Sequence, residues 1–516
     1  MDTNPPPVNS APGIPYVLRL KDNSRTDIDP VDDGILDLLD FFNNKTLAQI
    51  RNESPDATDG LLLLGRIEDI KQDNPIYTLF RPEKDGKLSL SIKTGNIMGV
   101  FTLRKGNVAV RLVIDSRFDD TDEQPFLCWM LERVLKVNLA DFVQSSSGEF
   151  WTILLELLFW HKLGEASSIG LYRQYQKMEY NDLRFRGRLD IDRHIRLNMP
   201  LWDKIAYSRR EIVFDNPINH LLRHAANIII SKWSKTLLNG SISMNKEARN
   251  MLMAIETNTP SWTPSNLNTI LWDRITTRRI SQPYYAEYYE ILRILARCII
   301  LRLGVDVYSD SSAGGDYSIN GIILDGAWLW EEYLSSIMTA PEFGFWHAIP
   351  DTRTLPIYAM SKEKERIKKR RPLYPDFRLP TSEAKDDPSN SVEQKASVVL
   401  DAKYKYGDAK DGISVRRTDM HQCLAYMLLT GAKVGGVIYP PNLNKQKTED
   451  DEKDDEESFF WDVNVPDSQR FWKSFTFRMW DKNKDFNEEM RDIENEFKQY
   501  LQDVIDKAKS PEAKKD

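Results

Sequence analysis

Residues 396–406 read ASVVLDAKYKY, and this stretch decides the fold of the C-terminal third of the chain. Its apolar run predicts a buried strand. Because side chains alternate across a strand, Asp401 and Lys403 are expected on one face and Ala402 on the other. A helical pattern, DMHQCLAYMLLTG, and a second apolar segment, KVGGVIYP, follow at residues 419–431 and 433–440. Strands that alternate with helices indicate an α/β or α+β domain.

A second carboxylate lies upstream of this strand, at Asp376 in Tyr374-Pro375-Asp376, a spacing of 25 (401 − 376). Two carboxylates near one lysine are suited to a hard divalent cation, Mg²⁺ or alternatively Mn²⁺. Lys403 can then orient or deprotonate a water and stabilise charge that grows on a phosphate. The competing interpretation is a surface strand pair with ordinary charges.

Two helices flank this candidate site. The first carries Glu331 and Glu332 in AWLWEEYLSSIM, about 100° apart around the helix axis. Trp328 and Trp330 of the same helix are expected to pack in the core. On the second helix, Gln422 and Tyr426 share one face because they are four residues apart; a plain core position is the alternative for Tyr426.

The rest of the chain divides by pattern. Residues 1–14 are proline-rich and predict a disordered tail, and 15–120 alternate as strands do, which predicts a β-rich domain. Residues 121–310 carry mainly helical spacing. Residues 311–510 form the α/β domain, with an acidic insertion at 443–457. At 516 residues, several domains are expected.

Charge and cysteine content set further limits. The net charge of −8 does not exclude DNA binding, because local charge decides it. Lys368, Lys369, Arg370 and Arg371 end a basic run that leads into the candidate site, so they are candidates for contacts to DNA phosphates; a solvated loop is the alternative. The three cysteines are far apart, which argues against a disulfide framework or a zinc site. No apolar run is long enough to cross a membrane and no secretion signal is evident, so we expect a cytoplasmic protein.

Two polar motifs in the middle region are open to more than one interpretation. His220 and His224 are one helical turn apart but lack the intervening glutamate of a zinc protease, so a structural role is favoured. In RGRLD, Arg186, Arg188 and Asp190 alternate along a predicted strand. A buried salt-bridge network is the favoured interpretation, and contact with DNA or a partner is the alternative.

The order of these motifs resembles that of a known family. Pro375-Asp376 and Asp401-Ala402-Lys403 resemble the PD-(D/E)xK nuclease signature. The segment GLYRQYQKMEYNDLRFRGRLDIDRHIRLN (170–198), then DNPINHLL (215–222), the acidic helix and DAKYK resemble McrC-type proteins, the nuclease subunits of McrBC modification-dependent restriction systems. The resemblance covers about residues 150–440, and the beginning of the chain matches less clearly.

This resemblance implies a metal-dependent DNA endonuclease with a restriction-endonuclease-like C-terminal domain. Asp376, Asp401, the Ala402 carbonyl and Glu331 would bind Mg²⁺, with Glu331 favoured over Glu332, and Lys403 would position the attacking water. Gln422 and Tyr426 would correspond to the QxxxY element of RecB-like nucleases, which contacts DNA or buttresses the site.

The resemblance also implies partners. The substrate would be double-stranded DNA, and the N-terminal and central regions would dock into a GTP-hydrolysing McrB-like AAA+ ring. No G-x-x-x-x-G-K-[ST] loop occurs, so the chain itself is expected to bind no nucleotide. Arg104 and Lys105 are candidates to stimulate the ring, although exposed charges are usually only solvated. Cleavage of both strands would need two copies, hence self-association within the complex.

Two other functions stay open from the sequence. The chain could be a RecB-like repair or recombination nuclease that works with a helicase. It could also be a non-catalytic scaffold that binds DNA and activates a GTPase ring.

Overall fold

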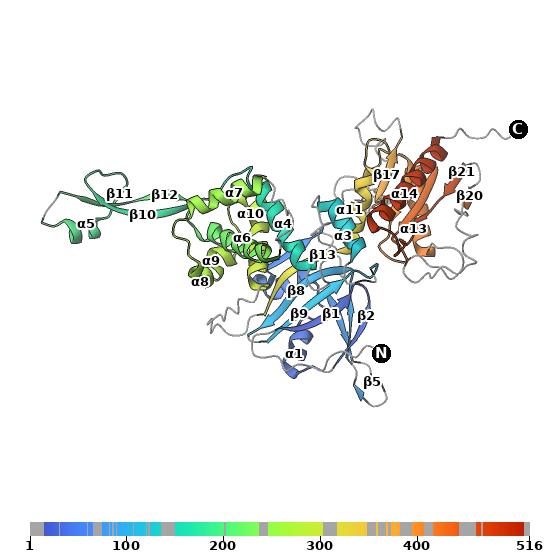
Figure 1. The fold of residues 1–516 in the computed structure, drawn as a ribbon. Coiled ribbons are helices and arrows are strands. Elements are labelled where there is room, and N and C mark those ends of the chain that lie inside the picture. Colours follow the sequence, from blue (N-terminus) through green and yellow to red (C-terminus); the bar gives the residue numbers. More distant parts are fainter. Residues whose placement is uncertain are drawn as a thin grey trace.

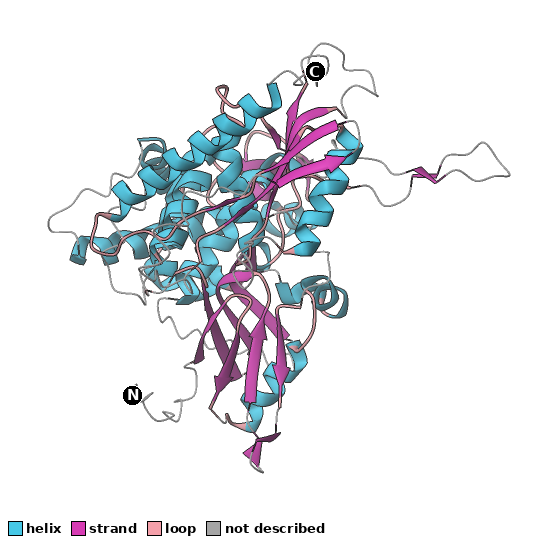
Figure 2. Ribbon diagram, turned by 90° about the vertical axis from the view of Figure 1, so that its right-hand side faces the viewer, coloured by secondary structure: helices cyan, strands magenta, loops and turns pink. Residues whose placement is uncertain are grey.

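Strands gather in two groups, one in an N-terminal and one in a C-terminal body, with helices between and beside them (Figure 2). A long strand pair reaches away from the helical part of the molecule (Figure 1). The chain therefore has several domains with mixed sheets, as the sequence predicts. The computed structural model describes residues 15–509 except 30, 59, 66–74, 82, 85–86, 89, 107, 120, 122–123, 136–149, 201–202, 237–245, 303–316, 348–357, 360–367, 370–372, 382–394, 407–415, 443–460 and 466–467.

A five-stranded sheet forms the N-terminal body, in the order β1-β9-β8-β13-β3. Its strands are β1 (Tyr16–Lys21), β3 (Gly60–Leu64), β8 (Ile97–Lys105), β9 (Val108–Asp115) and β13 (Tyr317–Asp325). β13 pairs antiparallel with β8 and parallel with β3. β13 thus belongs to the N-terminal sheet, although it lies beyond the expected domain boundary at residue 310. The local sequence pattern does not reveal this pairing, because both partner strands lie far upstream.

One face of this sheet packs on a core that includes two helices and a smaller sheet. The helices are α1 (Asp33–Phe42), which buries Ile35, Leu38, Leu39 and Phe42, and α2 (Leu47–Glu53). The smaller sheet consists of β2 (Arg25–Ile28), β4 (Tyr77–Phe80) and β7 (Leu90–Thr94), and β5 (Glu83–Lys84) pairs with β6 (Lys87–Leu88). Residues 15–120 are β-rich, but the expectation of strands throughout is wrong for α1 and α2, where apolar residues recur at helical spacing.

Helices dominate the middle of the chain. They are α3 (Pro125–Leu135), α4 (Phe150–Ala166), α6 (Pro217–Thr236), α7 (Lys246–Asn258), α8 (Leu267–Leu271), α9 (Arg274–Thr277) and α10 (Pro283–Arg302). α4 is buried on all sides from Trp151 to Trp160, and it packs against α7 and α10. Cys128, Cys298 and Cys423 are buried and form no disulfide with one another. None of the described helices combines the length and apolar composition that crossing a bilayer requires.

An arm projects from this helical region (Figure 1). It consists of β10 (Gln174–Asp182), β11 (Arg188–Leu189), α5 (Ile191–Asn198) and β12 (Ile205–Val213), with β10 and β11 both paired to β12. Large apolar side chains are exposed along it: Tyr175, Leu183, Phe185, Leu189, Ile191, Ile195, Leu197, Met199 and Ile212. Apolar exposure on this scale is typical of a surface that another molecule covers.

The RGRLD motif lies on this arm. Arg186 and Arg188 are exposed, and Asp190 caps α5 by accepting a hydrogen bond of 3.1 Å from the Arg193 N–H. The expected buried salt-bridge network is therefore wrong, because no second layer of the described structure covers these side chains. Contact with DNA or a partner is the interpretation that remains for them.

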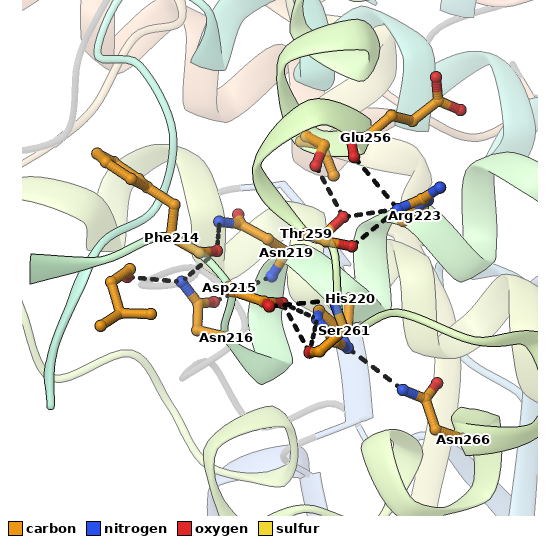
Figure 3. Close-up of polar contacts among 12 residues, drawn as sticks. Phe214, Asp215, Asn216, Asn219, His220, Arg223, Glu256, Thr259, Ser261 and Asn266 are labelled. Atoms are coloured by element: carbon orange, nitrogen blue, oxygen red, sulfur yellow. Dashed lines mark hydrogen bonds and ion pairs between the residues drawn. The ribbon is translucent and has the colours of Figure 1, made fainter. Parts of the chain in front are cut away.

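Two buried asparagines clamp the root of the arm (Figure 3). The Nδ2 of Asn216 donates to the carbonyls of Tyr172 and Phe214, both at 3.0 Å. The Nδ2 of Asn219 donates to the same two carbonyls, at 2.9 and 2.7 Å. Because the chain enters the arm just after Tyr172 and leaves it at Phe214, these four bonds hold both ends of the arm together.

A polar cluster beside this clamp contains His220 (Figure 3), and His224 contacts the same cluster through Asn266. His220 Nε2 lies 2.5 Å from Asp215 Oδ1 and 3.5 Å from Ser261 Oγ. His224 Nε2 lies 2.7 Å from Asn266 Oδ1. A catalytic triad needs the acid and the nucleophile on opposite ring nitrogens, whereas both meet the same nitrogen of His220. The cluster therefore joins α6 to the segment after α7, in agreement with a structural role.

The C-terminal sheet has the order β14-β17-β18-β19-β21-β20, and β22 also pairs with β19. Its strands are β14 (Trp346–His347), β17 (Phe377–Pro380), β18 (Ala396–Ala402), β19 (Val434–Tyr439), β20 (Trp461–Val465), β21 (Ser468–Trp472) and β22 (Phe475–Thr476). α13 (Arg417–Thr430) shares a core with Val399, whereas α11 (Gly326–Met338) and α14 (Phe486–Lys509) share one with Val398 and Leu400. Helices thus cover both faces. The acidic insertion 443–457 lies outside the described residues.

The close approach of β13 and β8 gives a test of the N-terminal sheet. Gly321 has a φ of +144°, and a Cβ there would lie 2.3 Å from the Val100 carbonyl oxygen. We expect Gly321→Ala to lower the free energy of unfolding by about 2–4 kcal/mol, because it adds backbone strain and a clash. Urea unfolding measures this. Gly34→Ala in α1, with its nearest neighbour at 3.4 Å, is the control and should not destabilise the protein. Equal stability of both variants would contradict the packing of these strands.

Candidate active site

The carboxyl groups of Asp376 and Asp401 meet where β17 pairs with β18. The strands are antiparallel with Phe377 opposite Leu400, so Asp376 and Asp401 lie side by side. The two side chains are close enough for each to shift the pKa of the other. Asp376 Oδ2 also accepts a hydrogen bond of 2.7 Å from the Ala402 N–H, which holds this carboxyl against the end of β18.

The two carboxyl groups are electrostatically strained. Asp401 is only 1% exposed. Burial, the charge of Asp401 and the charge of Glu331 raise the pKa of Asp376 well above its ordinary value. Burial also raises the pKa of Asp401, against the opposing charge of Lys403. Carboxyl groups in contact share a proton instead of both ionising, so this pair favours one bound proton or one bound cation.

Lys403 completes the group from the same strand. Its Nζ lies 2.6 Å from Asp401 Oδ2. Burial disfavours its charge, but the charges of Asp401 and Asp376 outweigh that effect and raise the pKa of Lys403 above its ordinary value. The side chain is therefore a cation at neutral pH, suited to bind an anion and not to remove a proton.

Glu331 approaches this group from α11. His347 Nε2 lies 2.6 Å from Glu331 Oε1, and the His347 ring stacks on Phe377 with 5.0 Å between ring centres. Glu331, rather than its neighbour Glu332, is the residue whose charge acts on Asp376.

The oxygen donors of this group suit a hard cation. Within the described ranges, no three His, Cys, Asp or Glu side chains converge as they stand to hold a metal ion. The two aspartates instead contact each other and Lys403. A divalent cation that displaced the shared proton would relieve the repulsion between them, and carboxylate oxygens are the ligands that Mg²⁺ and Mn²⁺ prefer. The residues present thus fit such an ion.

On α13, Gln422 is exposed, whereas Tyr426 is buried against the sheet. Gln422 Nε2 donates to Tyr426 Oη over 2.6 Å. Tyr426 is 2% exposed and belongs to the core between α13 and the sheet. Burial and the charge of Asp401 raise its pKa, so the ring is also close to the carboxyl pair. Tyr426 is thus a core residue that also lies close to the carboxyl pair.

Sequence reasoning missed a second ion pair at this site. Lys405 Nζ lies 2.7 Å from Asp419 Oδ1, and Tyr439 Oη donates to Asp419 Oδ2 over 2.9 Å. Asp419 is 3% exposed, and its charge raises the pKa of Asp401. Lys405 could have been found from the alternation of residues 401, 403 and 405. Asp419 and His347 carry no comparable local signal, because they approach from other elements.

Other residues that the sequence singles out lie on two further strands and on α11. Lys368 and Lys369 form β16, which pairs with β15 (Tyr358–Ala359), while Arg370 and Arg371 lie outside the described residues. Arg104 and Lys105 end β8 instead of lying on a turn, and both are exposed. Trp330 is buried as expected, whereas Trp328 is partly buried against the same core.

Comparisons with known proteins extend this description. A family model described as "McrBC 5-methylcytosine restriction system component" matches residues 92–440. No curated protein matches the chain.

Two chains from solved structures are similar at low identity. One is from a half-complex of the tetradecameric assembly of Thermococcus gammatolerans McrB AAA+ hexamers with bound McrC, at 15% identity and a TM-score of 0.48, covering 93% of this chain and 100% of that one. The other is from the Thermococcus gammatolerans McrBC complex, at 15% identity and a TM-score of 0.31, covering 63% and 88%. With TM-scores below 0.5, neither likeness supports a conclusion about this chain.

The strained carboxyl pair gives a test with a defined sign. A carboxyl whose pKa is raised by folding stabilises the protein at acidic pH and loses that contribution as pH rises through the folded pKa. In EDTA, Asp376→Asn should therefore gain stability relative to the natural chain as pH rises from about 4 to 8. Thermal unfolding across this range measures the difference. Asp492→Asn, at an exposed position of α14, should show no such trend. If the difference in stability between Asp376→Asn and the natural chain does not change with pH, the raised pKa of Asp376 is contradicted.

Proposed function

The chain belongs to the family of McrBC 5-methylcytosine restriction system components, and from this we propose that it is the McrC-type nuclease subunit of such a system. It cleaves double-stranded DNA by Mg²⁺-dependent phosphodiester hydrolysis, in a C-terminal domain of the PD-(D/E)xK type. The observation that carries the proposal is the contact among Asp376, Asp401 and Lys403 at the end of β18.

Each group at the site has a distinct role in this reaction. Asp376 and Asp401 would hold Mg²⁺, with the Ala402 carbonyl and Glu331 completing its ligands and Mn²⁺ as an alternative ion. The ion would supply Lewis-acid charge to the scissile phosphate. Lys403, held beside Asp401, would bind the phosphate oxygens and orient the attacking water. Gln422 and Tyr426 buttress Asp401 from α13 or contact the DNA beside it.

The partner follows from the family and from the arm. For this chain we propose a McrB-like GTP-hydrolysing AAA+ ring, with the exposed apolar side chains of the arm as a docking element. One active site cuts one strand, so double-strand cleavage requires two copies in the complex.

The family match favours this function over the two alternatives. A RecB-like nuclease that works with a helicase would use the same acids and lysine, but the matched family is a restriction component. A non-catalytic scaffold would gain nothing from two carboxyl groups in repulsive contact beside a lysine, since this arrangement costs stability in the absence of an ion.

Substitutions at the site test the catalytic proposal. Asp401→Ala and Lys403→Ala should each lower the rate of DNA cleavage about a hundredfold or more with Mg²⁺, because each removes a charge that acts on the phosphate. Partner association and thermal stability should be retained. Glu331→Ala should also lower the rate, whereas the matched control Glu332→Ala should retain it. Full cleavage by Asp401→Ala or Lys403→Ala would refute the site.

The arm is tested separately. Phe185 is 51% exposed and Leu189 is 43% exposed, so replacing both by Asp should leave the fold intact. We expect this variant to lose association with the GTPase ring, because apolar contact area drives docking. Co-elution and GTP hydrolysis measure the loss. Met253→Asp, at an exposed position of α7, is the control. Normal association of the Phe185/Leu189 variant would show that docking uses another surface.

A further inference from the structure

Arg117 lies two residues after β9 of the N-terminal sheet. It is buried, at 8% exposed. Its backbone N–H donates to Asp22 Oδ1 over 2.6 Å, and its Nη1 lies 3.6 Å from Asp22 Oδ2. Asp22 itself is fully buried just after β1. The ion pair therefore fixes the guanidinium at the edge of the N-terminal body.

The side chain of Arg117 then crosses to the C-terminal body. Its Nη2 donates to the backbone carbonyl of Tyr404. The guanidinium carbon lies 4.9 Å from the centre of the Tyr404 ring and 5.9 Å from that of Tyr406. Tyr406 Oη donates in return to the Arg117 carbonyl over 2.6 Å. Burying a cation costs free energy unless hydrogen bonds and aromatic rings compensate for the lost water. The contacts of the Arg117 guanidinium supply this compensation.

Tyr404 lies at a junction of the candidate active site. It directly follows Lys403, whose N–H donates to the Ile438 carbonyl over 3.0 Å at the end of β18. A Cβ on Gly326 would lie 2.5 Å from the Tyr404 ring, so this ring packs directly on the first residue of α11, the helix that carries Glu331. The Tyr404 hydroxyl also reaches Met98 Sδ of β8, at 3.5 Å.

We propose that Arg117 is a positioning residue for the nuclease centre. By holding the Tyr404 carbonyl, it fixes the backbone that follows Lys403 and keeps the ammonium beside Asp401. The N-terminal body is thus part of the active-site support and not only a docking domain. This inference rests on the proposed function for its catalytic consequence, while its structural consequence is independent of it.

The test compares variants that separate the Tyr404 bond from the rest of the cluster. Arg117→Met alone would leave Asp22 as an unpaired buried acid, so the double variant Asp22→Asn/Arg117→Met removes both charges. Asp22→Asn alone keeps the bond to Tyr404. Tyr406→Phe removes a hydrogen bond of the same cluster without touching that carbonyl, and it is the matched control. Arg117→Lys keeps a cationic donor and should restore part of the function.

Two readouts are needed, DNA cleavage with Mg²⁺ and backbone amide exchange over residues 401–406 by mass spectrometry. For Asp22→Asn/Arg117→Met we expect kcat to fall about tenfold or more with KM for DNA within about twofold, because only the alignment of Lys403 is lost. Exchange over residues 401–406 should accelerate. Asp22→Asn and Tyr406→Phe should retain most of kcat and slow exchange, and Arg117→Lys should lie between.

The outcomes separate this inference from the nuclease proposal. If the double variant folds and keeps both the natural kcat and slow exchange over residues 401–406, Arg117 does not position Lys403. If kcat falls by the same factor in the double variant and in Tyr406→Phe, the effect is one of general packing, and the inference is overturned as well. The nuclease proposal fails if the natural chain cleaves no DNA, or if Asp401→Ala cleaves DNA as fast as the natural chain does. In that case the amide exchange still decides whether Arg117 holds residues 401–406.

Discussion

Two carboxyl groups in contact inside a protein cannot both carry charge unless a proton or a cation lies between them, and the C-terminal domain is built around such a pair. The pairing of β17 with β18 sets Asp376 beside Asp401, and Lys403 supplies the one adjacent positive charge. Burial and mutual repulsion make the pair unfavourable on its own. The surrounding elements hold it in place: α13 contributes Tyr426, α11 contributes Glu331, and the end of β18 donates the Ala402 N–H.

The proposed function would explain this strain, because a site that binds a divalent cation must present oxygen ligands before the ion arrives. The same strain explains why the support extends beyond the catalytic strands. Tyr404 leaves β18 and packs against Gly326, Met98 and Arg117, so α11 and the N-terminal sheet meet at the residue after Lys403. The chain returns to the N-terminal sheet through β13 directly before α11. The two bodies are therefore connected both by chain path and by buried contacts.

The arm obeys a different constraint. It consists of three strands and a short helix, and no second layer of the described structure covers its apolar side chains, so packing within the arm does not explain Leu183 or Phe185. Only its root is held firmly, by the amides of Asn216 and Asn219. An exposed apolar surface on a firm base fits contact with another protein, whereas the catalytic residues need a rigid interior. The proposed docking surface and the proposed catalytic centre thus lie on different elements of the chain.

The sequence by itself indicated several of the local elements and the residue types of the candidate site. The alternation in ASVVLDAKYKY places Asp401 and Lys403 on one face of a strand, and the helical spacing after it places Gln422 with Tyr426, because both periods are properties of the backbone. The order of motifs indicated the family. Only the tertiary structure decided that β13 belongs to the N-terminal sheet, that RGRLD lies exposed on an arm, and that Asp419, His347 and Arg117 reach the site. These relations depend on contacts between segments far apart in the chain, and such contacts leave no periodic trace in the residues that make them.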